Sequence, residues 1–164
     1  MICAFTGHRP ERLPWGLNED DMRCAALKTL LRRTVQEVYD RGFHSFLCGM
    51  ARGCDQYFAE AVLACRAAGT APEAALTAMV PCPSQKDGWT ADEQARYDAL
   101  LTACSAVEVL EPVYTPGCML RRNRYLVDRA SLLLAVYDGI PKGGTMSTLA
   151  YALRQGVETV ILEV

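Results

Sequence analysis

The sequence lacks the excess of positive charge that nonspecific binding to nucleic acid requires. Its 164 residues carry 17 Lys and Arg against 19 Asp and Glu, which gives a net charge of −2. Because bulk attraction to a polyanion depends on such an excess, we expect no nucleic-acid partner. Lysine is scarce as well, since arginine accounts for 14 of the 17 basic residues. The planar guanidinium of arginine suits bidentate contacts with phosphate or carboxylate.

Long apolar runs are also missing. No run approaches the roughly 18 residues that a membrane-spanning helix needs. The N-terminus shows no basic stretch followed by an apolar stretch and a cleavage site. We therefore expect a cytoplasmic protein with no membrane partner.

Cysteine pairs with the spacing of metal ligands are absent, although the chain has eight cysteines. No C-x-x-C motif occurs, and even Cys48 and Cys54 have five residues between them. A zinc site uses closely paired ligands, whereas isolated cysteines in apolar segments behave as small hydrophobic residues. We expect buried free thiols, no metal site and no bound cofactor.

Short apolar runs alternate with helical patterns along the chain, which is typical of a parallel sheet covered by helices. Strands are predicted at residues 2–7, 44–49, 74–81, 106–112, 131–139 and 157–164. Helices are predicted over 27–38, over 55–69, after a Thr90–Glu93 capping box, over 119–130 and over 142–156. The sequence therefore predicts an α/β fold, a single-domain Rossmann-like three-layer sandwich with a mostly parallel sheet, formed by residues 1–164. Such folds bind ligands beyond the carboxyl ends of their strands.

The first predicted strand ends in Thr-Gly-His-Arg-Pro. Gly7 permits a tight turn, and His8 and Arg9 project past the strand because Pro10 disfavours a helical conformation at Arg9. A guanidinium at this position can clamp a phosphate or a carboxylate. We take Gly7, His8 and Arg9 as candidate ligand-binding residues, with a solvated surface loop as the alternative.

A glycine-containing turn, residues 48–55, follows the second predicted strand. Gly49 and Gly53 flank Arg52 and leave backbone N–H groups available to an anion at the start of the next helix. Asp55 fits the N-cap of that helix and is also a candidate catalytic acid. All four are candidate ligand-binding residues, although an ordinary turn explains the glycines equally well.

Three arginines fall within four positions of the predicted helix over residues 119–130, so they cannot all share one face of it. We expect at least one, with Arg122 as the candidate, to face a ligand cleft. Asn123 can supply amide hydrogen bonds. Asp128 is a further candidate ligand contact, with a helical ion pair to Arg124 as the alternative.

A double glycine follows the apolar strand over residues 131–139. Gly143 and Gly144, followed by Thr145 at the start of a helix, offer backbone and hydroxyl donors to a phosphate. The stretch is not a Walker A loop, because G-x-x-x-x-G-K-[ST] is absent. Asp138, just after the strand, is a second candidate catalytic acid.

Two aromatic residues are candidates for stacking on a nucleobase. Tyr137 lies at the end of the same strand as the double glycine, and Trp89 follows the third strand. Burial in the core is the alternative for Trp89, because that is the commoner place for tryptophan.

The ordered series of loops resembles the SLOG superfamily, named for the Smf/DprA and LOG proteins, and more narrowly its YpsA-like branch of small bacterial proteins. The series consists of Thr-Gly-His-Arg-Pro, Gly-Met-Ala-Arg-Gly-Cys-Asp, Gln85 with Trp89, Arg-Arg-Asn-Arg-Tyr-Leu-Val-Asp, and Tyr-Asp-Gly before a glycine turn. The resemblance covers nearly the whole chain. It implies a Rossmann-like fold, a pocket for a nucleotide or nucleotide-derived ligand, and a possible homodimer.

LOG-type phosphoribohydrolases have the pattern P-G-G-x-G-T-x-x-E at the last loop, and this chain departs from it. Met146 stands at the position of the third glycine and Ala150 at that of the glutamate. The glutamate would stabilise positive charge that develops on the ribose. An acid would have to come from elsewhere, with Asp55 and Asp138 as the candidates.

The leading hypothesis is a protein that binds a nucleotide or a nucleotide-derived phosphate ligand at the carboxyl edge of the sheet, as a sensor or regulatory protein. The first alternative is a LOG-like phosphoribohydrolase or N-glycosidase that acts on nucleoside monophosphates. The second is a module that binds single-stranded nucleic acid or another protein.

Overall fold

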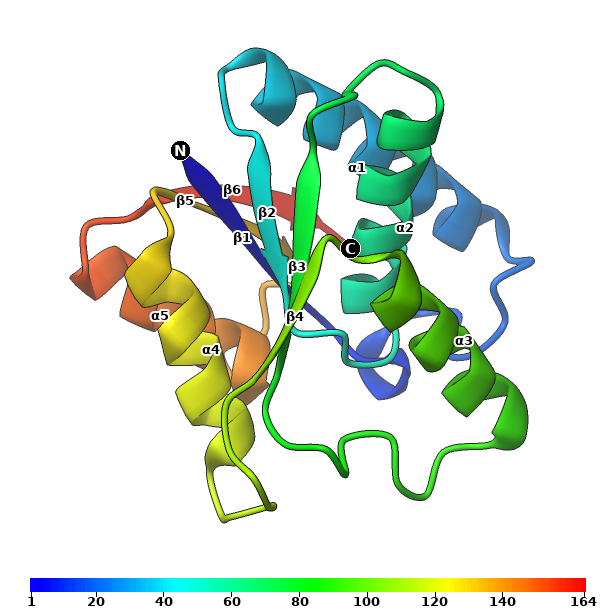
Figure 1. The fold of residues 1–164 in the computed structure, drawn as a ribbon, viewed down its shortest axis with the longest axis vertical. Helices are drawn as coiled ribbons and strands as arrows, with labels where there is room; N and C mark the ends of the chain where they lie inside the picture. The colour runs from blue at the N-terminus through cyan, green and yellow to red at the C-terminus, as the bar shows by residue number, and fades with distance from the viewer.

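Six parallel strands form one sheet in the computed structural model, which describes residues 1–164 (Figure 1). In sheet order the strands are β4 (Ala106–Val109), β3 (Ala75–Val80), β2 (Ser45–Cys48), β1 (Ile2–Gly7), β5 (Leu132–Tyr137) and β6 (Glu158–Glu163). Every neighbouring pair is parallel, so the sheet is wholly parallel where the sequence predicted a mostly parallel one. The predicted Rossmann-like α/β sandwich is confirmed.

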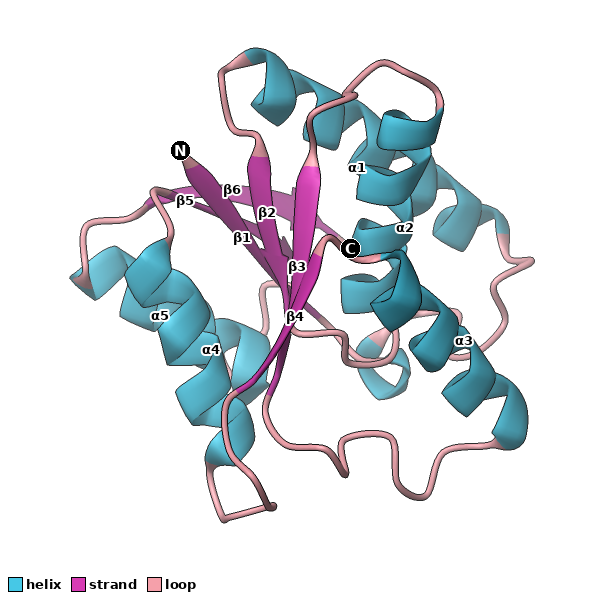
Figure 2. Ribbon diagram, in the orientation of Figure 1, coloured by secondary structure: helices cyan, strands magenta, loops and turns pink.

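Five α-helices cover the two faces of the sheet (Figure 2). On one face lie α1 (Met22–Asp40), α2 (Cys54–Ala67) and α3 (Ala91–Ala103), and on the other lie α4 (Cys118–Arg129) and α5 (Gly143–Arg154). A short 3-10 helix, Pro10–Arg12, follows β1 and was not predicted. None of the helices combines the length and the apolarity needed to cross a membrane.

Successive side chains of the central strands point to opposite faces of the sheet, so the core forms two layers. Cys3 and Phe5 of β1 belong to a cluster of 30 buried residues under α1, α2 and α3, whereas Ala4 belongs to a cluster of nine under α4 and α5. Phe5 stacks on Phe58 of α2 with 4.4 Å between the ring centroids. Because β5 is covered on both faces, it is apolar throughout instead of alternating.

The order of the strands reverses between β1 and β5. The chain places β2, β3 and β4 in succession on one side of β1 and then returns to place β5 on the other side. The connections that leave β1 and β5 therefore diverge, which opens a crevice at the carboxyl ends of these two strands.

Most boundaries lie within a few residues of the predicted ones. Helix α1 starts earlier than predicted, at Met22, because the Asp21 side chain accepts a hydrogen bond from the Arg23 N–H and caps it. Helix α2 has Gly53 as its N-cap, so the prediction that Asp55 caps this helix is wrong. The Thr90–Glu93 capping box of α3 is confirmed.

The cysteines pack as predicted. Seven of the eight are buried and Cys104 is half-buried. Five of them, Cys3, Cys24, Cys48, Cys54 and Cys65, act as small apolar residues of the larger core layer.

Candidate functional site

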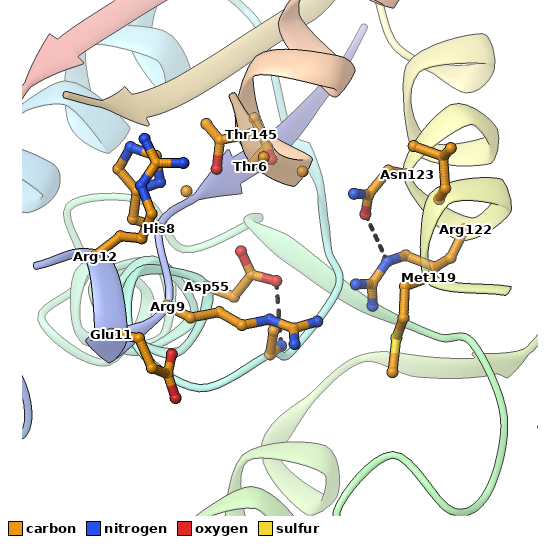
Figure 3. A pocket seen from close by; sticks show the side chains of 15 residues that line it. Thr6, His8, Arg9, Glu11, Arg12, Asp55, Met119, Arg122, Asn123 and Thr145 are labelled. Carbon is orange, nitrogen blue, oxygen red and sulfur yellow. Dashed lines mark hydrogen bonds between the residues drawn. The ribbon is translucent and has the colours of Figure 1, made fainter. Parts of the chain in front are cut away.

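A cleft of about 460 Å³ lies at the carboxyl ends of β1 and β5, where the strand order reverses (Figure 3). Its lining comes from the loop after β1, the start of α2, the first turns of α4 and the start of α5. The lining residues are Thr6, Gly7, His8, Arg9, Glu11, Arg12, Ala51, Asp55, Met119, Leu120, Arg122, Asn123, Gly143, Gly144 and Thr145. Its volume falls in the range of small-molecule sites.

Helix α5 begins at the cleft with free backbone donors. Its N-cap residue, Lys142, provides no side-chain cap, and the N–H groups of Gly143, Gly144 and Thr145 make no hydrogen bond within the protein. These groups and the positive end of the helix dipole favour an anion. Gly143 has a φ of +89°, and a Cβ there would lie 2.6 Å from Nη1 of Arg12, so the turn requires glycine.

A bidentate ion pair joins the loop after β1 to the loop after β5. Nη2 of Arg12 donates to both carboxylate oxygens of Asp138 at 2.8 Å, and Nε donates at 3.2 Å. Nη1 of Arg12 donates to the carbonyl of Lys142 at 2.6 Å, which holds the start of α5 in place.

The ion pair settles the protonation of Asp138. Burial opposes its ionisation, but hydrogen bonds from the Ile140 backbone N–H and from Arg12 outweigh burial and lower the pKa of Asp138 to about 2. The carboxylate is therefore ionised at neutral pH and has no proton to donate. Asp138 is engaged by Arg12 and does not line the cleft, and its catalytic role stays a prediction.

His8 is buried beside this ion pair. Its Nε2 lies 3.1 Å from the backbone nitrogen of Asp138, whose N–H it accepts, and 3.1 Å from Oδ1 of the same residue. Burial lowers the pKa of His8, and the Asp138 carboxylate opposes this shift only in part. His8 is therefore neutral at pH 7 and supports the loop without adding charge to the cleft.

Asp55 faces the cleft from the first turn of α2. Its side chain is 6% exposed, and Oδ2 accepts a hydrogen bond from the Ala51 N–H at 3.1 Å. Burial raises the pKa of Asp55, while the charge of Arg122 and the hydrogen bond from Ala51 oppose the rise. Of the two candidate acids, Asp55 is the one whose environment favours the protonated form.

Arg122 is the most deeply buried cation of the cleft, with 3% exposure. Its Nη1 donates to the backbone carbonyl of Gly49 and to Oε1 of Gln85, and its Nε donates to Oδ1 of Asn123 at 2.8 Å. A Cβ at Gly49 would lie 2.5 Å from Cζ of Arg122, so this glycine makes room for the guanidinium.

The guanidinium of Arg122 has no ionic partner. No carboxylate lies within 4.0 Å of it, and its Nη2 makes no hydrogen bond, in contrast to Nη1 and Nε. Burial lowers the pKa of Arg122, and the charge of Asp55 is the largest effect that opposes this shift.

Arg9 is the second cation that lacks a partner. It is exposed, forms no ion pair, and extends into the cleft beside Asp55 in Figure 3. Among the other charged lining residues, Arg12 is neutralised by Asp138, and Glu11 pairs with Arg52 at 3.1 Å. The cleft therefore contains two unpaired guanidinium groups against one carboxyl group whose pKa is raised.

Two predicted contact residues lie outside the cleft beside α3. Arg52 donates to Glu93 and Glu11 at 3.2 and 3.1 Å and lies over the ring of Trp89, 5.5 Å from its centroid. Trp89 also packs edge-on against Tyr97. Both side chains are engaged there and neither lines the cleft, so the structure does not bring Arg52, predicted to bind the ligand, or Trp89, predicted to stack on a base, together with the other site residues.

Four other predicted residues are also displaced from the cleft lining. Asp128 is exposed and accepts a hydrogen bond from the Tyr151 hydroxyl at 2.7 Å. Tyr137 packs beside the His8 ring and donates to Sδ of Met146 at 3.3 Å. Gly49 and Gly53 shape the turn around Arg122 and the His8 carbonyl instead of presenting N–H groups to the cleft.

The sequence interpretation gave no role in the site to Arg12, Gln85, Met119 or Leu120, all of which shape the cleft. Arg12 was not predicted as a site residue. Pro10 is a signal for the short helix Pro10–Arg12, and this helix turns the Arg12 side chain back toward β5. Gln85 holds Arg122 from the loop after β3, a long-range contact with no local signal. Met119 and Leu120 line the cleft although the prediction for this helix considered only its charged and amide residues.

The fold and the cleft together define a Rossmann-like protein with a small-molecule cleft where the strand order reverses. More narrowly, the chain belongs to the YpsA family: the family model described as the YspA SLOG family matches residues 3–161. Similar proteins include the UPF0398 proteins of Bacillus thuringiensis (strain Al Hakam) and Bacillus cereus (strain Q1). Each is 24% identical over 160 residues, which cover 94% of this chain and 84% of the relative.

A solved structure shares the fold over the whole chain. DNA processing protein A from Helicobacter pylori, described as binding single-stranded DNA, matches with a TM-score of 0.63 and 16% identity. The match covers 100% of this chain, which spans 66% of the length of that one.

This finding corrects the expectation that nucleic acid is not a partner. That expectation rested on the net charge of −2. A fold of this kind serves in a protein described as binding single-stranded DNA, so the net charge alone does not exclude such a partner. Local cations that lack partners decide what a cleft attracts.

Proposed function

We propose that the cleft binds a phosphate group of a nucleotide or a nucleotide-derived ligand, and that the protein acts as a sensor or regulatory protein. The observation that carries the proposal is Arg122, a buried guanidinium held by carbonyl and amide oxygens with no carboxylate in ion-pair contact. An unpaired buried charge is costly. A phosphate in the cleft supplies the missing opposite charge.

Two other groups face the same space. Arg9 brings an exposed guanidinium that has no partner, and α5 brings the free N–H groups of Gly143, Gly144 and Thr145. Guanidinium forks and helix N-termini are the two protein groups best suited to phosphate. Asp55 opposes anion binding only when it is ionised, and burial disfavours that state.

Arg9→Ala tests the proposal, with calorimetric titration of inorganic phosphate and of nucleoside mono-, di- and triphosphates. We expect at least one nucleotide to bind and Arg9→Ala to weaken it roughly tenfold to a hundredfold, because hydrogen bonds to charged groups contribute about 1.5–3 kcal/mol. The free energy of unfolding of Arg9→Ala should stay within about 0.5 kcal/mol of the wild-type value, since the Arg9 side chain makes no contact that the fold needs.

Arg33→Ala is the matched control, since Arg33 is an exposed arginine on α1 whose only ion pair is with Glu37 at 3.6 Å. It should leave nucleotide affinity unchanged. If no nucleotide binds, or if Arg9→Ala binds as tightly as Arg33→Ala, the proposal fails. Assaying the same mixtures for free base tests the phosphoribohydrolase alternative, with Asp55 as the candidate acid in the cleft.

The likeness to the Helicobacter pylori protein favours a second candidate, in which the phosphate belongs to single-stranded DNA. Anisotropy of a labelled oligonucleotide at two salt concentrations tests it. Binding that weakens with salt and is reduced by Arg9→Ala supports this candidate. Absence of binding at low salt refutes it and leaves the free nucleotide.

A further inference from the structure

The α4 wall of the cleft differs in chemistry from the rest. Met119 and Leu120 come four and three positions before Asn123, so each is a neighbour of Asn123 on the surface of this helix, and all three line the cleft. Apart from Ala51, Met119 and Leu120 are the only apolar residues of the lining. Of the groups that would hold the phosphate, only Arg122 lies on α4, whereas Arg9 and the donors of α5 come from other elements.

The orientation of the Asn123 amide is fixed by its neighbour. Nε of Arg122 carries a hydrogen and can only donate, so the group that faces it at 2.8 Å must be the amide oxygen, Oδ1. The amide nitrogen, Nδ2, consequently points the other way. It makes no hydrogen bond within the protein, and Figure 3 shows the nitrogen end of Asn123 directed into the cleft.

We propose that Asn123, with Met119 and Leu120, forms a nucleobase subsite that selects bases with a carbonyl group over bases with an amino group at the matching position. This inference rests on the proposed function, in which the phosphate is held by Arg9, Arg122 and the start of α5. The apolar side chains pack on the ring, and methionine adapts well to such a surface. The Nδ2 hydrogens donate to a base carbonyl, whereas an exocyclic amino group has no acceptor to offer them.

Matched pairs of nucleotides test the selection. Uridine and cytidine monophosphates differ by a carbonyl against an amino group, and inosine and adenosine monophosphates differ in the same way. The phosphate and ribose are identical within each pair. We expect wild-type protein to bind the carbonyl member about fivefold to tenfold more tightly, since one hydrogen bond contributes about 1 kcal/mol.

Asn123→Asp replaces the amide N–H donor that faces the cleft with a carboxylate oxygen, which can only accept. One carboxylate oxygen still accepts from Nε of Arg122, and the other presents an acceptor to the base. The ratio of affinities should therefore favour the amino members, whatever the fall in affinity caused by the added charge. Asn123→Ala should remove the preference, and Arg124→Ala, which changes an exposed neighbour outside the cleft, should retain it. A melting curve of each variant checks that it is folded.

The outcomes separate the two proposals. If nucleotides bind in an Arg9-dependent way but the wild type shows no preference, or Asn123→Asp keeps the same preference, the base subsite is refuted and the phosphate site stands. If no nucleotide binds to the wild type, both proposals fail.

Discussion

Asp55→Asn should strengthen anion binding in the cleft. The Asp55 carboxyl group faces the same space as Arg9 and Arg122, so its negative charge opposes a bound anion. At a separation of about 6 Å and an effective dielectric constant of about 20, this repulsion amounts to about 3 kcal/mol. Solvent ions reduce it, so we expect a gain in affinity of roughly tenfold. Asparagine has the same shape and keeps an oxygen for the Ala51 N–H.

The sign of the pH dependence follows from the raised pKa of Asp55. Ionised Asp55 weakens binding, so the affinity of the wild type for sulfate should rise as the pH falls through the pKa of Asp55, above its ordinary 3.8. Asp55→Asn should lack this gain. His8, whose pKa is lowered, adds positive charge at acid pH in both proteins, and Asp138 stays ionised because its pKa is about 2. His8→Gln in both backgrounds separates the two contributions.

Stability gives a second readout of Asp55. Because its folded-state pKa is raised, the protonated group contributes stability that is present below pH 3.8 and is lost as the pH rises through the folded-state pKa. Asp55→Asn should therefore melt at a higher temperature than the wild type at pH 7, and the difference should shrink as Asp55 becomes protonated. Calorimetric titration of sulfate from pH 4 to pH 8, with melting curves, measures both effects. Equal sulfate affinity of wild type and variant over the whole range from pH 4 to pH 8 refutes the reasoning.

Three further substitutions test the support of the cleft and the core. Gly143→Ala should lower the free energy of unfolding by about 1–2 kcal/mol, because position 143 has a left-handed backbone, and should disturb Arg12, whose Nη1 lies 2.6 Å from the added Cβ. Gly144→Ala is the control and should be tolerated, because its Cβ meets nothing within 4 Å. Urea unfolding and phosphate titration compare the two variants. Asp138→Asn should lower the free energy of unfolding at pH 7 by about 1.5–3 kcal/mol through loss of the Arg12 pair. The difference in the free energy of unfolding between wild type and Asp138→Asn should shrink as the pH falls from 3.8 toward 2, because wild-type Asp138 becomes protonated there. Phe58→Ala should lower the free energy of unfolding, measured with urea, by about 3–5 kcal/mol, because it removes a fully buried ring from the core.

The architecture could be predicted because its signals are local. The strand over residues 2–7 and the Thr90–Glu93 capping box were predicted as they occur. The apolar run of β5 indicated burial on both faces. Gly143 and Gly144 after that strand indicated a helix start at the carboxyl edge, where the structure places it.

The composition of the cleft could be predicted only in part, because partners far apart in the chain decide it. Nothing in the local sequence shows that Arg52 is engaged by Glu93 and Glu11. Nor does it show that Asp138 meets Arg12, 126 residues away in the chain. Arg9 and Arg122, unlike Arg52, have no carboxylate partner within ion-pair distance, which three-dimensional packing alone reveals.

The most direct test of the phosphate site is a titration of ¹⁵N-labelled protein with uridine monophosphate, followed through the backbone amide resonances. The largest shifts should occur at Gly143, Gly144 and Thr145, because their N–H groups have no partner in the free protein and would donate to the phosphate. Arg9→Ala should reduce these shifts at equal nucleotide concentration. Saturable shifts centred elsewhere on the protein, or no shifts at these three amides, would contradict the account.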